Sequence, residues 1–272
     1  MSKENDNEFE VYRDEPMEKL LRLHLTRLIA YAESTEPTLQ REVAEKLANE
    51  AVRPERQVQI VDLGGLQLLM PLTKSRDKEV QRLAAHALAN LSVNTQNQVR
   101  MAEEGSIDVL VDMLDCDSVH VQRQASKALA NVGVNVDNKA KIATAGGIRP
   151  LVKLAKSSYV GVAVEAIAAL ANLAVNDHNE LEIVKVGGLA PIIEAAGAAN
   201  MDLQAQAARA LRNLSVHQIN QDQIRNLGGV KILQSIAASE NNRISQQATR
   251  ALLNLGISCS VSIRGLKLGF HR

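Results

Sequence analysis

Asparagine recurs along this chain at a constant step of 41 residues, at positions 49, 90, 131, 172, 213 and 254. Glycine keeps the same step at positions 64, 105, 146, 187 and 228. A fixed period of this length is the signature of a repeat protein, in which one supersecondary unit is stacked many times. Because stacking brings equivalent residues side by side, we expect the repeated asparagine to form a row along one surface.

The composition suits a stack of helices and argues against nucleic-acid binding. Apolar residues make up 46% of the 272 residues, and a repeat protein of this length has one continuous core. The 31 basic and 31 acidic residues balance, whereas nucleic-acid binders usually carry a basic excess. Aromatic residues make up 2% of the chain and tryptophan is absent, so we expect no platform for stacking bases.

The two cysteines and the N-terminal residues favour a reduced, cytoplasmic protein. Cys116 and Cys259 lie far apart and lack metal-ligand spacing. The first ten residues are polar and acidic, and Ser2 stands where N-myristoylation needs glycine. The most apolar run, 160–175, contains Glu165 and is too short to cross a bilayer. We expect no direct membrane insertion. Association through a partner, or through a lipidated N-terminus missing from this sequence, stays open.

Each repeat is predicted to contain three helices. Residues 138–176 show the pattern: NKAKIATAGGIRPLVKLAKSSYVGVAVEAIAALANLAVN. The glycine pair separates a short helix from a medium one, because glycine allows positive φ and close backbone approach. Pro150 and Pro191 fall in the first turn of the medium helix, where a missing N–H costs little. A polar break then precedes a long helix that ends near the repeated asparagine.

The long helix is expected to bury a stripe of small and large apolar side chains. Alanine stands three residues before the repeated asparagine at 87, 128, 169, 210 and 251, and leucine stands two before it at 47, 88, 129, 170, 211 and 252. Close stacking of helices requires such a stripe.

These features resemble the armadillo repeat family. The glycine-pair turn, the three-helix unit and the A-L-A-N-L ending of the long helix carry the resemblance over residues 17–258. Residues 138–157 are especially similar to armadillo-only scaffold proteins. HEAT repeats are the alternative, but they usually lack the glycine pair and the A-L-A-N-L ending. The resemblance implies an all-α, right-handed α-solenoid of about six units over residues 16–258, between a tail at 1–15 and a tail or partial repeat at 259–272.

In armadillo proteins the long helix lines a concave groove, and its asparagines hydrogen-bond the backbone of an extended peptide. The resemblance therefore implies a protein-binding groove, and an amide suits this task because it both donates and accepts. Positions seven and four residues before each asparagine, and four after it, share its helix face. The expected groove residues are Asn90, Asn131, Asn172, Asn213, Asn254, His86, Lys127, Gln124, Gln206, Arg209 and Arg250. The alternative is that each asparagine only bonds locally at its helix end.

The flanking charges indicate the polarity of the partner. Basic residues gather in two groups, Arg82, His86, Arg123 and Lys127, then Arg209, Arg212, Arg243 and Arg250, and are interrupted by Glu42, Glu45 and Glu165. Nuclear-import adaptors of the family carry tryptophan four residues before the asparagine, which this chain lacks, whereas the beta-catenin branch resembles its polarity. We expect a scaffold or adaptor that binds extended, acidic protein segments. A transport adaptor for nuclear or motor cargo is the alternative, and a merely solvated charged face is the simplest explanation of the charges.

Three further segments carry expectations. A second asparagine row at 97, 138, 179 and 220 is expected to cap the short helix. Residues 1–15 hold six acidic and two basic residues and are expected to be disordered, either as a solubilising tail or folded back on the basic groove. Residues 259–272 cap the last repeat, meet a partner, or belong to a fragment or a divergent terminus.

No catalytic constellation is evident in the sequence. The glycine pairs match neither a phosphate loop nor a dinucleotide motif, and the six histidines are scattered. We therefore expect no enzyme activity and no catalytic residue. We also expect no metal, no cofactor and no small-molecule substrate.

Overall fold

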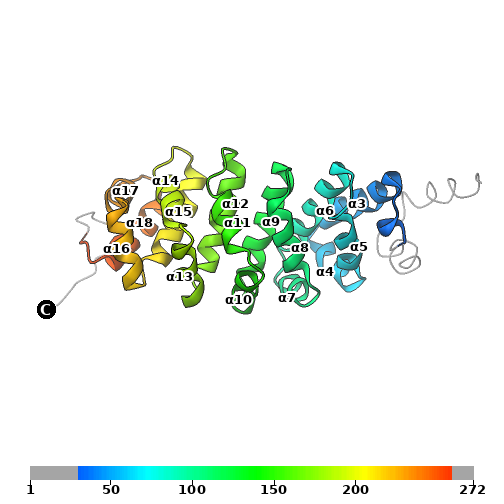
Figure 1. Ribbon diagram of the computed structural model, residues 1–272, viewed down its shortest axis with the longest axis horizontal. Coiled ribbons are helices and arrows are strands. Elements are labelled where there is room, and N and C mark those ends of the chain that lie inside the picture. The colour runs from blue at the N-terminus through cyan, green and yellow to red at the C-terminus, as the bar shows by residue number, and fades with distance from the viewer. Residues whose placement is uncertain (1–29, 259–272) are drawn as a thin grey trace, which may run out of the picture. The chain divides into compact units, whose positions relative to one another are not determined.

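The computed structural model describes residues 30–258 (Figure 1). Within that range the chain forms α-helices and one short 3-10 helix, and it contains no strand. The chain divides into two compact units, with the boundary in the sequence between Asn172 and Leu173, and each unit is described by itself. The expectations for residues 1–15, for the start of the first repeat and for residues 259–272 lie outside the described residues.

The helices follow the predicted three-helix repeat. In the first unit the long helices are α3 (Pro37–Ala51), α6 (Lys78–Leu91), α9 (Val119–Val132) and α12 (Val160–Leu173), whose last residue belongs to the second unit. The short helices are α4 (Pro54–Asp62), α7 (Thr95–Glu103) and α10 (Val136–Thr144). The medium helices are α5 (Gly65–Leu72), α8 (Ser106–Asp112), extended by η1 (Met113–Asp115), and α11 (Ile148–Leu154).

The second unit contains two further repeats of the same kind. Its short helices are α13 (Asp177–Lys185) and α16 (Gln218–Asn226). The medium helices are α14 (Leu189–Ala196) and α17 (Gly229–Ala237), and the long helices are α15 (Met201–Leu214) and α18 (Asn242–Asn254). The prediction of a short, a medium and a long helix in each repeat is therefore confirmed.

Equivalent helices of successive repeats pack against one another. In the first unit α6 lies between α3 and α9, and the short helices α4, α7 and α10 follow the same order (Figure 1). In the second unit α15 contacts α18 and α14 contacts α17. The predicted apolar stripe is completely buried, as Ala87, Leu88, Leu129, Ala210 and Leu211 illustrate. Alanine at the contact lets the helix backbones approach, and leucine fills the remaining space.

The glycine pair serves both predicted purposes. The first glycine of each pair has a positive φ, as at Gly146 with φ of 82°. The second lies against the preceding short helix, because a Cβ atom on Gly147 would stand only 2.9 Å from Cγ2 of Ile142. Pro150 falls in the first turn of α11, as expected.

The prediction for the second asparagine row is wrong. The short helices are capped three residues earlier, by the side chains of Asn94, Asn135, Asn176 and His217, which accept backbone N–H groups. Asn97 and Asn138 are instead buried inside the helix. Asn138 donates from Nδ2 to the carbonyl oxygens of Gln98 at 2.9 Å and Val132 at 3.2 Å. Because Gln98 belongs to the preceding repeat, this amide joins two repeats.

The residue directly after each asparagine of the second row, or its equivalent in α4, is a further position for a hydrogen-bond donor. The side chains of Gln57, Gln98 and Gln221 occupy this position. Each donates from Nε2 to the carbonyl oxygen six residues earlier, at a distance of 3.1 Å. Lys139 donates from Nζ to Val134 O at 2.9 Å. Glu180 occupies this position in α13 with 5% exposure, and a carboxylate has no hydrogen to donate. Burial raises the pKa of Glu180 above its ordinary value of 4.5.

Asn138→Ala is expected to destabilise the protein by about 2 kcal/mol, because two buried carbonyl oxygens lose their donor. Asn220 provides the matched control. It is fully buried, but neither polar atom of its side chain has a hydrogen-bond partner among the described residues. Asn220→Ala should therefore cost less. Thermal unfolding followed by circular dichroism compares the two variants, and an equal loss of Tm would contradict the bridging role of Asn138.

Glu180→Gln is expected to stabilise the protein by about 1 kcal/mol at neutral pH, because the amide can donate the missing hydrogen bond. Since the folded pKa of Glu180 is raised, the stability of the wild type falls as pH rises through that pKa. The Tm difference should therefore be smallest near pH 4.5 and should grow towards neutral pH. Gln221→Glu should show the opposite sign, and a difference independent of pH would refute the explanation.

Candidate peptide-binding surface

The asparagine row lies near the C-terminal ends of the long helices. It consists of Asn49, Asn90, Asn131 and Asn172 in the first unit and Asn213 and Asn254 in the second. The first and last members are exposed, and the other four are half-buried. Because the leucine two positions earlier is buried in the stack, the packing of each long helix fixes where its asparagine stands.

Several members of the row donate a hydrogen bond to the preceding repeat. Asn131 Nδ2 donates to Ser92 Oγ at 3.0 Å, and Asn172 Nδ2 donates to Ala130 O at 2.7 Å. Asn254 Nδ2 donates to the carbonyl oxygen of Arg212 and to Ser215 Oγ, both at 3.1 Å. Ala130 and Arg212 lie in the last turn of a long helix, where carbonyl oxygens lack an intrahelical partner.

These bonds leave part of each amide unused. Among the described residues, no group donates to Oδ1 of Asn131 or of Asn172, and each amide also keeps a second N–H. Local bonding at the helix end is therefore present, but it does not exhaust the asparagine. It also holds the side chain in one orientation, which lowers the entropy cost of binding. The sequence signal for this bond was a serine two residues after the preceding asparagine, as at Ser92 and Ser215.

His86 takes part in the surface as a neutral group. Its Nε2 atom lies 3.2 Å from Nδ2 of Asn90. Burial lowers the pKa of His86, and the nearby charges of Arg82 and Lys127 lower it further. At neutral pH the ring is therefore uncharged, and Nε2 can accept a hydrogen bond from the Asn90 amide.

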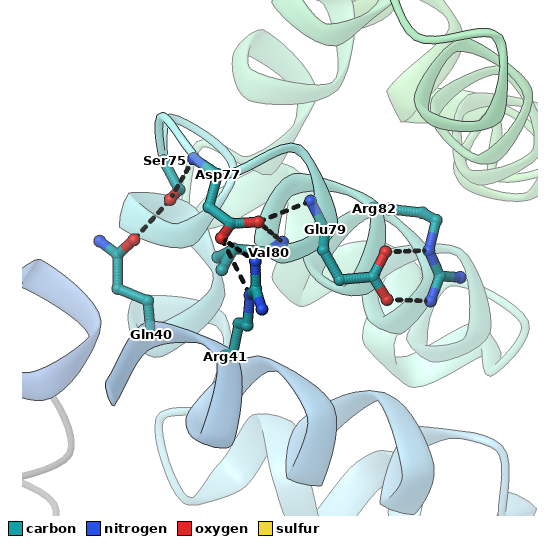
Figure 2. Close-up of polar contacts among 7 residues, drawn as sticks. All are labelled: Gln40, Arg41, Ser75, Asp77, Glu79, Val80 and Arg82. Atoms are coloured by element: carbon teal, nitrogen blue, oxygen red, sulfur yellow. Dashed lines mark hydrogen bonds and ion pairs between the residues drawn. The ribbon is translucent and has the colours of Figure 1, made fainter. Parts of the chain in front are cut away.

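Two arginines on this side of the first unit are already paired (Figure 2). Arg82 donates from Nε and Nη2 to the carboxylate of Glu79 at 2.8 and 2.6 Å, and Arg41 makes a similar pair with Asp77. Arg82 thus adds little net charge to the surface. The basic group predicted in the first unit rests mainly on Arg123 and Lys127.

Glu165 on α12 belongs to the same cluster. Burial raises the pKa of its carboxyl group, and Lys127 and Arg123 partly offset this effect. The side chain of Arg123 also lies against Gly161, where a Cβ atom would stand 3.2 Å from its Nε. The first unit therefore combines two cations with one half-buried carboxyl group.

The second unit carries a denser basic group. Burial lowers the pKa of Arg209, and repulsion from Arg243 and Arg212 lowers it further. Arg212 donates to Gln247 Oε1 at 3.0 Å and to Asn213 Oδ1 at 3.2 Å, whereas Arg250 is exposed. An accumulation of positive charge on one helix face attracts anionic groups.

The remaining predicted positions are less accessible. Gln124 and Gln206 are half-buried, and their Oε1 atoms are buried without a donor among the described residues. An unsatisfied buried acceptor costs about 1–3 kcal/mol. The positions four residues after Asn90, Asn131, Asn172 and Asn213 are occupied by the side chains that cap the short helices.

Residues 30–258 contain neither a metal-binding cluster nor a helix suited to span a membrane. This range contains no group of three or more His, Cys, Asp or Glu side chains placed to hold a metal ion. None of the described helices has both the length and the apolar character needed to span a bilayer.

Solved structures of repeat proteins are similar to this chain. The crystal structure of one engineered protein has 35% identity and a TM-score of 0.79, and the match covers 85% of this chain and 95% of that one. A designed armadillo repeat protein has 26% identity and a TM-score of 0.79, with 84% and 98% covered. Another, in complex with the peptide (KR)4, has 25% identity and a TM-score of 0.76, also with 84% and 98% covered. No curated protein matches the chain.

The family comparison agrees with the repeat geometry. A family model described as Armadillo-like matches residues 20–196, which is more than half of the chain. The helix order, the glycine-pair turns and the buried alanine and leucine stripe are present on both sides of the unit boundary. The chain therefore belongs to the armadillo-like family, and its fold is an all-α solenoid of armadillo repeats.

Proposed function

We propose that this chain is a non-catalytic, cytoplasmic scaffold or adaptor whose asparagine row binds extended segments of partner proteins. The observation that carries the proposal is the row of oriented amides. Asn131 and Asn172 are each fixed by one internal hydrogen bond and keep Oδ1 for a ligand. An extended peptide presents N–H and C=O groups at regular steps, which amides can pair without reading side chains. The peptide complex of a designed armadillo relative supports this proposal.

Partner segments are proposed to be acidic. Lys127 in the first unit and Arg250 in the second stand four residues before an asparagine of the row, where they can pair with carboxylates. The designed relative was solved with a basic peptide, (KR)4. This chain has no tryptophan, the residue that stands beside the asparagine row in nuclear-import adaptors of the family. The charges beside the asparagine row therefore favour the opposite polarity.

The double variant Asn131→Ala/Asn172→Ala is expected to lose captured partners about tenfold or more, because two oriented amides contribute roughly 1 kcal/mol each. A pulldown followed by mass spectrometry compares it with the wild type. Asn138→Ala is the matched control, because it also removes bonds between repeats but lies off the asparagine row. Unchanged capture by a folded double variant would refute the surface, and recovery of import or motor proteins would favour transport.

Lys127→Glu and Arg250→Glu are each expected to weaken the affinity for a captured partner and to reduce its dependence on salt. Exposed charge pairs weaken as ionic strength rises, so binding by the wild type should fall between about 0.05 and about 0.5 M NaCl. Isothermal titration at both salt concentrations measures the effect. Binding by the wild type that is insensitive to salt would exclude an acidic partner segment.

A further inference from the structure

A row of exposed valines follows the asparagine row at the same 41-residue step. The valine row consists of Val52, Val93 and Val134 in the first unit and Val175 and Val216 in the second, each three residues after an asparagine of the row. These residues are 55–67% exposed. Two other exposed apolar residues, Val136 and Tyr159, have no apolar counterpart in the other repeats, and exposed Val160 and Met201 share a position in two repeats only. An apolar surface that repeats with the fold indicates an interaction site.

In the first unit the valine row runs beside the asparagine row. On α6 and the turn after it, His86, Asn90 and Val93 follow one another at steps of about one helical turn. On α9 the equivalent residues are Lys127, Asn131 and Val134. The backbone N–H groups of the two valines donate to the carbonyl oxygens of Asn90 and Asn131, at 3.2 and 3.1 Å. Since α6 packs against α9, the asparagines lie between a polar row and an apolar row.

A peptide along the asparagine row therefore meets different surfaces on its two sides. Side chains of an extended chain alternate, so every second one faces His86 and Lys127 and the others face Val93 and Val134. Side chains on one side of such a chain are about 7 Å apart, which approaches the 8–10 Å between packed helices. This surface fits a segment in which acidic and apolar residues alternate.

In the first unit, the polar side of the surface offers positions for two acidic residues. The equivalent position on α3 is Glu45, which repels a carboxylate, and on α12 it is Ala168, which carries no charge. Within the first unit, only α9 places a cation there, Lys127, and only α6 places a neutral hydrogen-bonding ring, His86. In the second unit, Arg209 and Arg250 occupy this position. Arg123, on the same helix as Lys127, adds a second positive charge, while Glu165 opposes it.

The chain itself contains a segment with this alternation, Glu8-Phe9-Glu10-Val11. We propose that residues 8–11 bind across α6 and α9 and compete with partner segments for the same surface. Glu8 and Glu10 then face His86 and Lys127, and Phe9 and Val11 pack on the valine row. The four tail residues from 12 to 15 can span about 14 Å when extended, which exceeds the roughly 8–10 Å between packed helices. The inference rests on the proposed peptide-binding surface.

The absence of tryptophan allows a direct measurement in the full chain. Phe9→Trp introduces a single indole, whose emission should be shifted to shorter wavelength than that of the same chain in denaturant. Acrylamide should also quench the native chain less strongly. Adding Val93→Ser/Val134→Ser, or adding Lys127→Glu, should move the emission back to longer wavelength. Adding Val136→Ser is the matched control, because Val136 is 76% exposed but lies off the valine row, and it should change nothing.

Competition gives a second readout. Glu8→Lys/Glu10→Lys should release the segment and increase partner capture in the pulldown. The inference would be overturned if acrylamide quenched the indole as strongly as in denaturant and the valine substitutions did not change its emission. Emission that depends on protein concentration would overturn it too, because contact would then be between two copies. If the segment is exposed while capture still requires Asn131 and Asn172, only this inference fails; if capture does not require them, the proposed function fails.

Discussion

Close packing between equivalent helices is the constraint on which the other features depend. Alanine at the contact, as at Ala87 and Ala210, leaves no side chain to hold the backbones apart. The glycine pair acts in the same way at the turn, where Gly147 touches Ile142 of the short helix. Because the same contacts recur in each repeat, each solvent-facing position is multiplied into a row. The asparagine row and the valine row both arise in this way.

The features that depend on local chemistry could be predicted from the sequence. The period follows from residues that recur along the chain, and the helix order, the glycine turns and the buried stripe follow from residue types within one repeat. The cap position could not, because Asn94 and Asn97 are both good caps and stand three residues apart. Packing of the short helix selects Asn94 as the cap and buries Asn97 between repeats. The valine row was missed because exposure cannot be read from an apolar side chain alone.

The chemistry of the candidate surface depends on contacts that a single repeat does not reveal. In the sequence, Arg82, His86 and Lys127 are grouped together as basic residues. In the folded protein Arg82 pairs with Glu79, and burial keeps His86 neutral, so these three residues differ in charge and role. The pair of Arg82 could have been anticipated, since residues three apart on a helix are neighbours. The pKa of His86 could not, because it depends on the depth of the ring beside the next repeat.

The hydrogen bond from Asn131 to Ser92 has a consequence for how such a surface can change in evolution or design. The amide that we propose to pair a peptide belongs to one repeat, but the atom that orients it belongs to the repeat before. Moving a single repeat to another place in a stack would transfer the asparagine without its orienting partner. The smallest portable element of recognition is therefore a pair of adjacent repeats, and the junction between them carries as much information as either repeat.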